Sequence, residues 1–141
     1  MNSWTILAFS LFIYMCFWYL ISILVKRNDV ADIGWGLGFI LLAWLSFGLE
    51  NKPSHAIMNN ILISIWGLRL SWHIGTWLIK QEEDFRYAAW RKEWKHFHLR
   101  SFLQVFMLQG SLLFIIATPI IRINMSEEIS GPVFYWLGTL L

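Results

Sequence analysis

The stretch SWTILAFSLFIYMCFWYLISILV, Ser3–Val25, contains no charged residue and is longer than the ~20 residues that a helix needs to cross a bilayer core. Of the 141 residues in the chain, 57% are hydrophobic and 14% are charged, against about 25% charged in soluble domains. A chain this short cannot bury so much apolar surface in its own core. No basic residue precedes the stretch and no small-residue cleavage pattern follows it, so we predict a retained membrane helix rather than a signal peptide.

Three more apolar stretches have the length of a membrane span, at residues 33–49, 56–79 and 102–121. A fifth, at 133–141, has less than half that length, so it is either a half-span buried in protein or a sign that the chain stops before its natural end. We favour the second interpretation. With no repeat or strand pattern, the sequence predicts an all-α polytopic transmembrane helical bundle with four full spans and a partial fifth. Residues 1–141 then form a single membrane domain, the N-terminal part of a longer protein.

Charge and cysteine content exclude several classes of function. The net charge of +2 is too small to suggest nucleic-acid binding, and the single cysteine, Cys16, rules out a disulfide framework within the chain. Cys16 lies within the first apolar stretch, where we expect it to pack toward lipid. His96 and His98 are two residues apart with no thiolate nearby, so no metal site is predicted.

The distribution of basic residues predicts the orientation of the chain in the membrane. Eight of the eleven Lys and Arg residues fall in the loops 26–32 and 80–101, and only Lys52 and Arg122 fall on the opposite side. Positively charged loops stay in the cytoplasm. We therefore expect an integral multi-pass protein with its N-terminus outside and these two loops cytoplasmic.

The remaining basic residue, Arg69, lies in the segment WGLRLSWHI, residues 66–74, near the middle of the third predicted span. It is roughly 15 Å from the cytoplasmic end of that span, too far for its side chain to reach the interface. His73 follows four residues later and shares its helix face, as do Trp66 and Trp77. We expect this face to point toward the protein interior or a hydrated cavity, because charges within the membrane are costly.

No carboxylate of the sequence lies at the depth of Arg69, so its partner stays open. The three alternatives are backbone carbonyls or water in a cavity, an anionic ligand, and an acidic group on helices that are not in this chain. Arg69 and His73 also have a purely structural interpretation, in which they hydrogen-bond neighbouring helices. Together they favour a polar cleft.

The segment DVADIGWGLGF, residues 29–39, begins the second predicted span. Asp29 and Asp32 are placed where carboxylates cap the free N–H groups of a helix, and Asp32 is also a candidate for the mouth of the cleft. Gly34 and Gly38 are four residues apart, which allows another helix to approach closely. The glycines do not have the spacing of a dinucleotide-binding loop.

The polar segment 82–100 has an aromatic periodicity. Tyr87, Trp90, Trp94 and Phe97 fall on one face of a helix, and the basic residues fall elsewhere. This pattern predicts an amphipathic helix in the membrane interface, with basic residues near anionic headgroups. In the alternative interpretation, Arg86 and the later Arg91 bind the phosphates of a cofactor.

The three blocks DVADIGWGLGF, WGLRLSWHI and EEDFRYAAWRKEW, in this order and spacing, resemble the N-terminal half of the steroid 5-alpha-reductase-like membrane family, in its domain-of-unknown-function 1295 branch. Better-known members of that family use NADPH to reduce a carbon–carbon double bond conjugated to a ketone in steroids or other lipids. The resemblance implies the same cofactor and a hydrophobic, lipid-like substrate. The family's C-terminal block of arginine, histidine, proline, asparagine and tyrosine does not occur here.

The resemblance also implies a set of cofactor-binding positions, with no catalytic residue assigned. The residues that match the family's polar positions are Arg69, His73, Asp84, Arg86, Tyr87 and Arg91. Two other functions stay open on the residues alone. One is a non-enzymatic helix-packing or assembly protein in which Arg69 meets a partner's carboxylate, and the other is a membrane methyltransferase.

Overall fold

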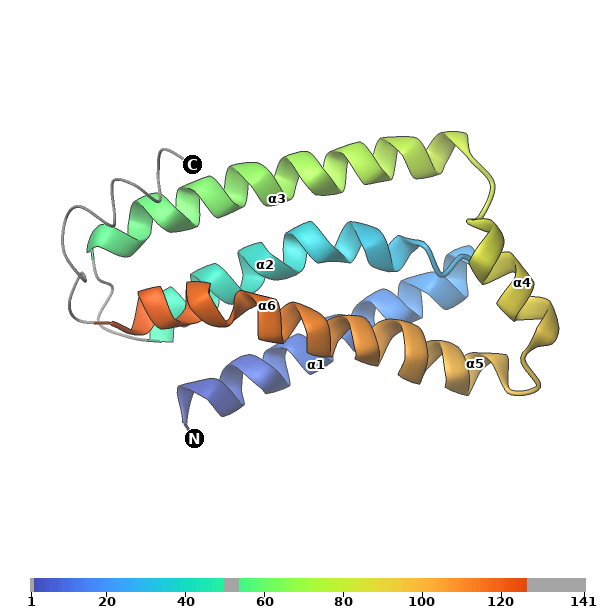
Figure 1. Ribbon diagram of the computed structural model, residues 1–141, viewed down its shortest axis with the longest axis horizontal. Coiled ribbons are helices and arrows are strands. Elements are labelled where there is room, and N and C mark those ends of the chain that lie inside the picture. The colour runs from blue at the N-terminus through green and yellow to red at the C-terminus, as the bar shows by residue number, and fades with distance from the viewer. Residues whose placement is uncertain (1, 50–53, 127–141) are drawn as a thin grey trace.

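The computed structural model describes residues 2–49 and 54–126 of the chain, and helices make up nearly all of this part (Figure 1). The elements are α1 (Ser3–Val25), α2 (Val30–Leu49), α3 (Ser54–Lys80), α4 (Phe85–Glu93), α5 (Phe97–Arg100), the π-helical segment η1 (Ser101–Met107) and α6 (Leu108–Met125). The all-α prediction is confirmed for these residues. The predicted fifth stretch, 133–141, lies outside them.

Three of the described helices are long and apolar enough to cross a membrane: Ser3–Val25, Val30–Leu49, and Phe97–Met125, which joins α5, η1 and α6. The helix α3 matches the predicted span 56–79 in position and has 27 residues, but it is not among the three. Its sequence contains Asn59, Asn60, Arg69 and His73, which lower its apolar character. The prediction of a membrane protein is therefore supported, whereas four full spans are not.

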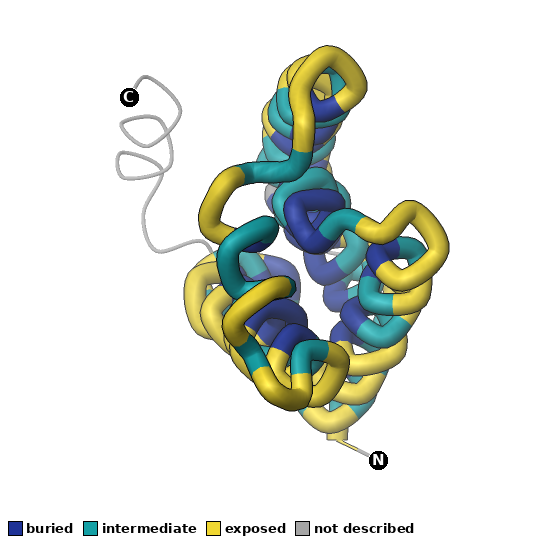
Figure 2. The backbone as a smooth tube through the Cα atoms, turned by 90° about the vertical axis from the view of Figure 1, so that its right-hand side faces the viewer, coloured by how far each residue is buried: buried dark blue, intermediate teal, exposed yellow. Residues whose placement is uncertain are grey.

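The helix α2 lies at the centre of the bundle, with α1 and α6 on one side and α3 on the other (Figures 1 and 2). Its glycines permit this arrangement. A Cβ atom on Gly34 would lie 3.0 Å from the Trp18 ring of α1, and one on Gly38 would lie 2.5 Å from Leu113 of α6. The packing role predicted for these two glycines is confirmed.

On the opposite side of α2, Gly36 packs against Gly67 of α3, a partner that the sequence did not predict. A Cβ atom on Gly67 of α3 would lie 2.6 Å from the carbonyl oxygen of Gly36, so the two backbones are in direct contact. The Ser71 hydroxyl donates to the carbonyl oxygen of Ile33 at 2.8 Å and ties the same two helices together. Close backbone approach through small residues is the usual packing mode of membrane helices.

The buried core lies between α1, α2, η1 and α6 and includes Leu7, Leu11, Leu42, Phe106 and Leu113. The outer face of α1 carries exposed apolar side chains, Phe9, Phe12, Ile13, Phe17 and Leu20. Such a surface suits contact with lipid, since a soluble protein of this size rarely exposes so continuous an apolar face.

The interfacial helix differs from its prediction. The helix α4 ends at Glu93, and a new helix begins at Phe97, so the segment 82–100 is not one continuous helix. The aromatic face nevertheless persists, because the Trp90 and Trp94 rings stack at 4.9 Å and Tyr87 meets Trp90 edge-on at 5.5 Å. The chain turns here so that α4 lies across the end of the bundle, and the next long helix starts at Phe97 rather than 102 (Figure 1).

Candidate functional site

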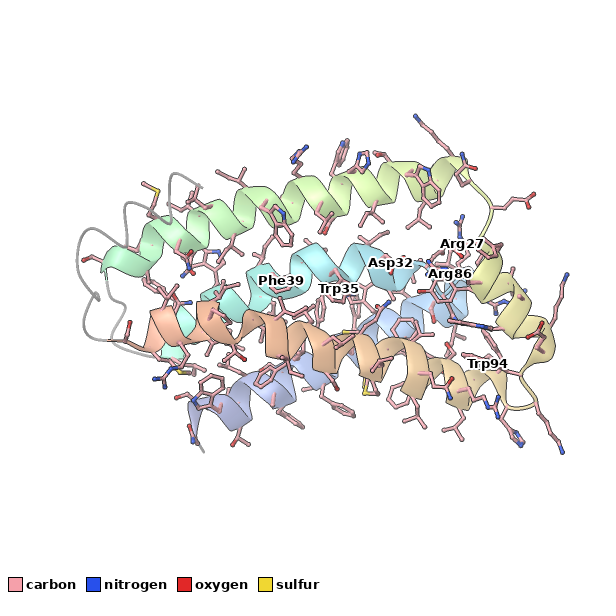
Figure 3. All side chains as sticks on the ribbon, viewed as in Figure 1. Arg27, Asp32, Trp35, Phe39, Arg86 and Trp94 are labelled. Carbon is pink, nitrogen blue, oxygen red and sulfur yellow. The ribbon has the colours of Figure 1, made fainter. Side chains whose placement is uncertain are left out.

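Polar and charged groups gather at the end of the bundle where α1 ends, α2 begins and α4 lies (Figure 3). The chain leaves α1 through Lys26, whose φ of 58° places it in the left-handed region, with its N–H bonded to the carbonyl oxygen of Ser22. This turn brings the next residues, Arg27 to Asp29, against the segment that joins α3 to α4.

Arg27 organises the junction between the α1–α2 loop, residues 26–29, and the α3–α4 loop, residues 81–84. Its Nε and Nη2 donate to the two carboxylate oxygens of Asp29 at 3.1 and 2.9 Å. Its Nη1 donates to the carbonyl oxygens of Leu78 and Gln81, both at 2.9 Å. These carbonyls lie at the C-terminal end of α3, where a cation satisfies unpaired acceptors and meets the negative end of the helix dipole. The hydrogen bonds to Asp29 raise the pKa of Arg27.

Asp29 is only 2% exposed and also accepts the backbone N–H of Asp84 at 3.1 Å. The prediction that this side chain caps α2 is wrong, because its two oxygens are occupied by Arg27 and by the start of α4. A buried carboxylate bonded to a guanidinium takes the strongest available donor in preference to helix N–H groups.

Glu83 and Arg91 form a second ion pair. The Arg91 Nη2 lies 2.9 Å from Glu83 Oε1, and its Nε lies 3.3 Å from Oε2. The same Oε1 accepts the backbone N–H of Asn28 at 2.8 Å, and Arg91 Nη2 donates to the carbonyl oxygen of Lys26 at 2.9 Å. Arg91 therefore ties α4 to the end of α1.

Asp84, Arg86 and Tyr87, three of the residues implied by the family resemblance, lie together at the start of α4. Asp84 caps the helix by accepting Arg86 N–H at 2.9 Å, and its carboxylate also accepts Arg86 Nε and Nη2, both at 3.0 Å. These bonds lower the pKa of Asp84. The Arg86 guanidinium lies 5.8 Å from the centre of the Tyr87 ring. Its side chain is 56% exposed, so it is accessible to a ligand.

Tyr87 is only 6% exposed, and burial raises its pKa to about 12, with the nearby Asp32 carboxylate adding to the effect. Its phenol is therefore protonated throughout the physiological range. A protonated phenol is a hydrogen-bond donor.

Asp32, at the first turn of α2, accepts Gln109 Nε2 of α6 at 3.3 Å. The Gln109 Oε1 atom is buried and has no hydrogen-bond partner among the described residues. Asp32 also lines a cavity of about 370 Å³ between α2 and α3, together with Trp35, Leu70, Ile74 and Trp77. Asp32 and Trp35 are labelled on α2 in Figure 3. This cavity is not the polar cleft expected from the sequence, because neither Arg69 nor His73 lines it.

The structure does not bring Arg69 and His73 to this site. Both residues are exposed, on the face of α3 opposite the Gly67 and Ser71 contacts with α2, and neither side chain bonds to a described residue. Arg69 also lies eleven residues before the end of α3, roughly 16 Å along the axis. For the described part of the chain, the predicted inward orientation of this face is wrong.

Three residues of the junction were not proposed as site residues from the sequence: Arg27, Asp29 and Glu83. All three lie in short loops between long helices, and this position is the sequence feature that could have identified them. A charged side chain in such a loop can bond a distant segment of the chain. In the ranges that the structure describes, no group of three or more His, Cys, Asp or Glu side chains is arranged to hold a metal ion.

Comparison with known proteins identifies the family. The model of the family described as "Protein of unknown function (DUF1295)" matches residues 18–141. No curated protein and no solved structure matches the chain. The matched region includes α2, α3 and α4, whose sequences carry the three blocks DVADIGWGLGF, WGLRLSWHI and EEDFRYAAWRKEW. The chain therefore belongs to the DUF1295 family, the steroid 5-alpha-reductase-like branch of helical membrane proteins.

Proposed function

We propose that this chain is an integral-membrane, NADPH-dependent reductase of lipid or steroid-like substrates that contain a carbon–carbon double bond conjugated to a ketone. Membership of the DUF1295 family supports the proposal. The cavity between α2 and α3 supports it further, because its walls are indole rings and aliphatic side chains with one carboxylate, Asp32, at its edge. Mostly apolar walls with few polar groups are typical of sites for hydrophobic ligands.

The observation that carries the proposal is the Asp32 and Gln109 pair. It places a carboxylate and an amide between two helices that are apolar enough to span a membrane, where polar groups are costly and mark functional sites. No described residue donates to Gln109 Oε1, and an unpaired buried acceptor costs about 1–3 kcal/mol. Asp32 is the member of this pair that lines the cavity.

The charged residues of α4 fit the phosphates of a dinucleotide. Arg86 is half-exposed, and its Nη1 makes no hydrogen bond to a described residue, so it is available to an oxyanion while Nε and Nη2 hold Asp84. Arg91 is also exposed in part, beside Glu83. We assign Arg86, Arg91, Asp84 and Tyr87 to the cofactor side of the site. Arg69 and His73 would contribute only through a ligand or a further helix that lies against the outer face of α3.

The chemistry divides between cofactor and protein. When bound, NADPH supplies the hydride that adds to the double bond. The chain's own residues position the substrate and stabilise the negative charge that develops on the ketone oxygen. We assign this hydrogen bond to Tyr87, because a neutral phenol is a donor and the nearby Asp32 carboxylate lines the cavity.

The direct test is NADPH binding by the purified chain, followed through the change in NADPH fluorescence. We expect saturable binding that the Arg86→Gln substitution weakens at least tenfold, because a charge-assisted bond to phosphate is lost. The matched control is Lys95→Gln, which removes one positive charge from an exposed position in the same region. Equal weakening by both variants would indicate only general attraction, and absence of binding by this chain and by any longer form of the protein would refute the proposal.

The proposal places the α4 end of the bundle in the cytoplasm, where soluble NADPH is present. The positive charge of the loops 26–32 and 80–101 supports this orientation. In a Cys16→Ser background, we expect Lys95→Cys to react with a membrane-impermeant thiol reagent only after the membrane is opened. Labelling in sealed cells would contradict the orientation.

A second candidate function is helix packing with a partner subunit, favoured by the exposed Arg69 on the outer face of α3. Within a bilayer, an exposed guanidinium on this face would need an acidic partner. Under this alternative, Arg69→Leu disrupts a complex seen by cross-linking in native membranes, and the chain does not bind NADPH. Under the reductase proposal, the complex is not required for NADPH binding.

A further inference from the structure

A separate polar cavity of about 300 Å³ lies where the end of α1 meets the start of the long helix Phe97–Met125. Its polar lining comes from Lys26, Asn28, Arg91, His98 and Ser101. It shares no lining residue with the cavity at Asp32. Its volume is at the lower end of the range for small-ligand sites, which is about 300–1,000 Å³.

Two donors in this cavity are unpaired. Asn28 is 2% exposed and Ser101 is 1% exposed, yet Asn28 Nδ2 and Ser101 Oγ have no hydrogen-bond partner within residues 2–49 and 54–126. Neighbouring groups of the same cavity are paired, since Ser22 Oγ donates to the carbonyl oxygen of Tyr19 at 2.7 Å. Buried donors without partners are rare, and they favour a ligand that accepts from both.

The charge of the cavity selects an anion. Lys26, Arg91 and His98 line it, and no carboxylate is among its lining residues. Glu83 bonds Arg91 and therefore neutralises its guanidinium, while Lys26 makes no ion pair with a described residue. A phosphate group has several oxygen acceptors, so it can accept from the amide and the hydroxyl and interact with an ammonium group at the same time.

The surroundings of the cavity indicate that this phosphate is attached to a lipid. Tyr19, Ile23 and Phe97 also line the cavity, and Leu20 and Leu24 of α1 are exposed next to it along the helix. Both α1 and Phe97–Met125 are apolar enough to span a membrane. The first ends beside this cavity and the second begins there, which is the level expected for lipid headgroups. Apolar chains attached to the phosphate would lie along the outer face of α1.

We propose that this cavity binds the phosphodiester of an anionic glycerophospholipid, with Asn28 Nδ2 and Ser101 Oγ as its short-range donors and Lys26 as its counter-charge. The cavity shares Arg91 with the proposed cofactor site, but the lipid proposal depends on Lys26, Asn28 and Ser101, to which the reductase proposal gives no role. Zwitterionic phosphatidylcholine carries the same phosphodiester with an added cation, which the basic lining disfavours.

Native mass spectrometry of the full chain in detergent provides the test, with phosphatidylglycerol, phosphatidylcholine and soluble glycerol 3-phosphate titrated separately. We expect phosphatidylglycerol to bind at least tenfold more tightly than either of the others. Ser101→Ala and Asn28→Ala should each weaken its binding roughly tenfold, because each removes a hydrogen bond to a charged group without changing the charge of the protein. Lys26→Asn, which tolerates the left-handed backbone at this position, should weaken it to a similar extent.

The control is Lys92→Asn, an exposed lysine of α4 that does not line the cavity. Equal losses for Lys26→Asn and Lys92→Asn, or unchanged binding in both Ser101→Ala and Asn28→Ala, would overturn the proposal. Binding of glycerol 3-phosphate as tight as that of phosphatidylglycerol would overturn the assignment to a lipid. Should Asn28→Ala fail to fold, Ser101→Ala decides the result, since the Ser101 hydroxyl makes no bond whose loss could unfold the chain.

Discussion

Arg27 binds both carboxylate oxygens of Asp29, at 3.1 and 2.9 Å, and the same guanidinium donates to the end of α3. This one pair therefore joins the α1–α2 turn to the C-terminus of α3. Asp29 also accepts the backbone N–H of Asp84, the N-cap residue of α4. The pair therefore fixes where α4 lies across the bundle. The residues of α4 that we assign to the cofactor depend on it for their position.

The first prediction concerns this pair. Asp29→Asn should lower the free energy of unfolding by about 3 kcal/mol, because it leaves a partly buried guanidinium without its counter-charge. Chemical denaturation in detergent, followed by tryptophan fluorescence, measures the change. The control is Asp84→Asn, which keeps a residue able to cap α4 and disrupts the more exposed pair with Arg86. We expect it to cost no more than ~1 kcal/mol. Equal effects would show that Arg27 and Asp29 are not the structural pair.

The second prediction concerns the titration of Tyr87. Its pKa is about 12 in the folded chain and 10 without the effect of the fold, so the fold favours the neutral phenol. The stabilisation is present below pH 10 and is lost as the pH rises from 10 toward 12, because the unfolded chain then ionises first. The difference in phenolate absorbance between the native protein and Tyr87→Phe isolates this group. Ionisation of Tyr87 near pH 10 in the folded protein would contradict its burial.

The third prediction tests the contact of α2 with α3. Gly67→Ala should destabilise the protein by about 1–3 kcal/mol, because the added methyl group would meet the Gly36 carbonyl oxygen at 2.6 Å and Ile40 at 2.9 Å. A matched control is Gly48→Ala on α2, where a Cβ atom meets nothing within 4 Å. There we expect a gain of about 0.5–1 kcal/mol, since alanine favours helix over glycine. Thermal unfolding of the two variants should therefore shift in opposite directions.

The fourth prediction concerns a buried amide at the other end of the bundle. Asn124 Nδ2 donates to the carbonyl oxygen of Ala43 and to Ser46 Oγ, both at 2.8 Å, and to Asn60 Oδ1 at 3.2 Å. Asn124→Ala should cost about 1–3 kcal/mol, because these buried acceptors on α2 and α3 lose their donor.

Thr118→Val provides the comparison for Asn124→Ala. Thr118 lies on the same helix, but its hydroxyl bonds only to the carbonyl oxygen of Phe114 within that helix, so its loss should cost less. Comparable unfolding midpoints for the two variants would show that Asn124 does not hold α6 to α2 and α3.

Much of the site could be anticipated from local sequence. The aromatic face of Tyr87, Trp90 and Trp94 was predicted from its spacing and persists although the helix breaks after Glu93. The close packing at Gly34 and Gly38 was likewise predicted, because small residues four apart have few other uses in an apolar helix. Asp84, Arg86 and Tyr87 are neighbours in sequence, so their proximity requires no knowledge of the tertiary fold.

The sequence by itself determined that this is a helical membrane protein, because uninterrupted apolar stretches and their lengths are local properties. Only the tertiary structure decided which face of α3 turns outward with Arg69, since Gly67 and Ser71 on the opposite face bind α2 more closely. It also decided that Asp29 pairs with Arg27 and Glu83 with Arg91. The partner of a charged side chain in a short loop depends on the distance between the two groups and on their burial. The packing of the long helices determines both quantities.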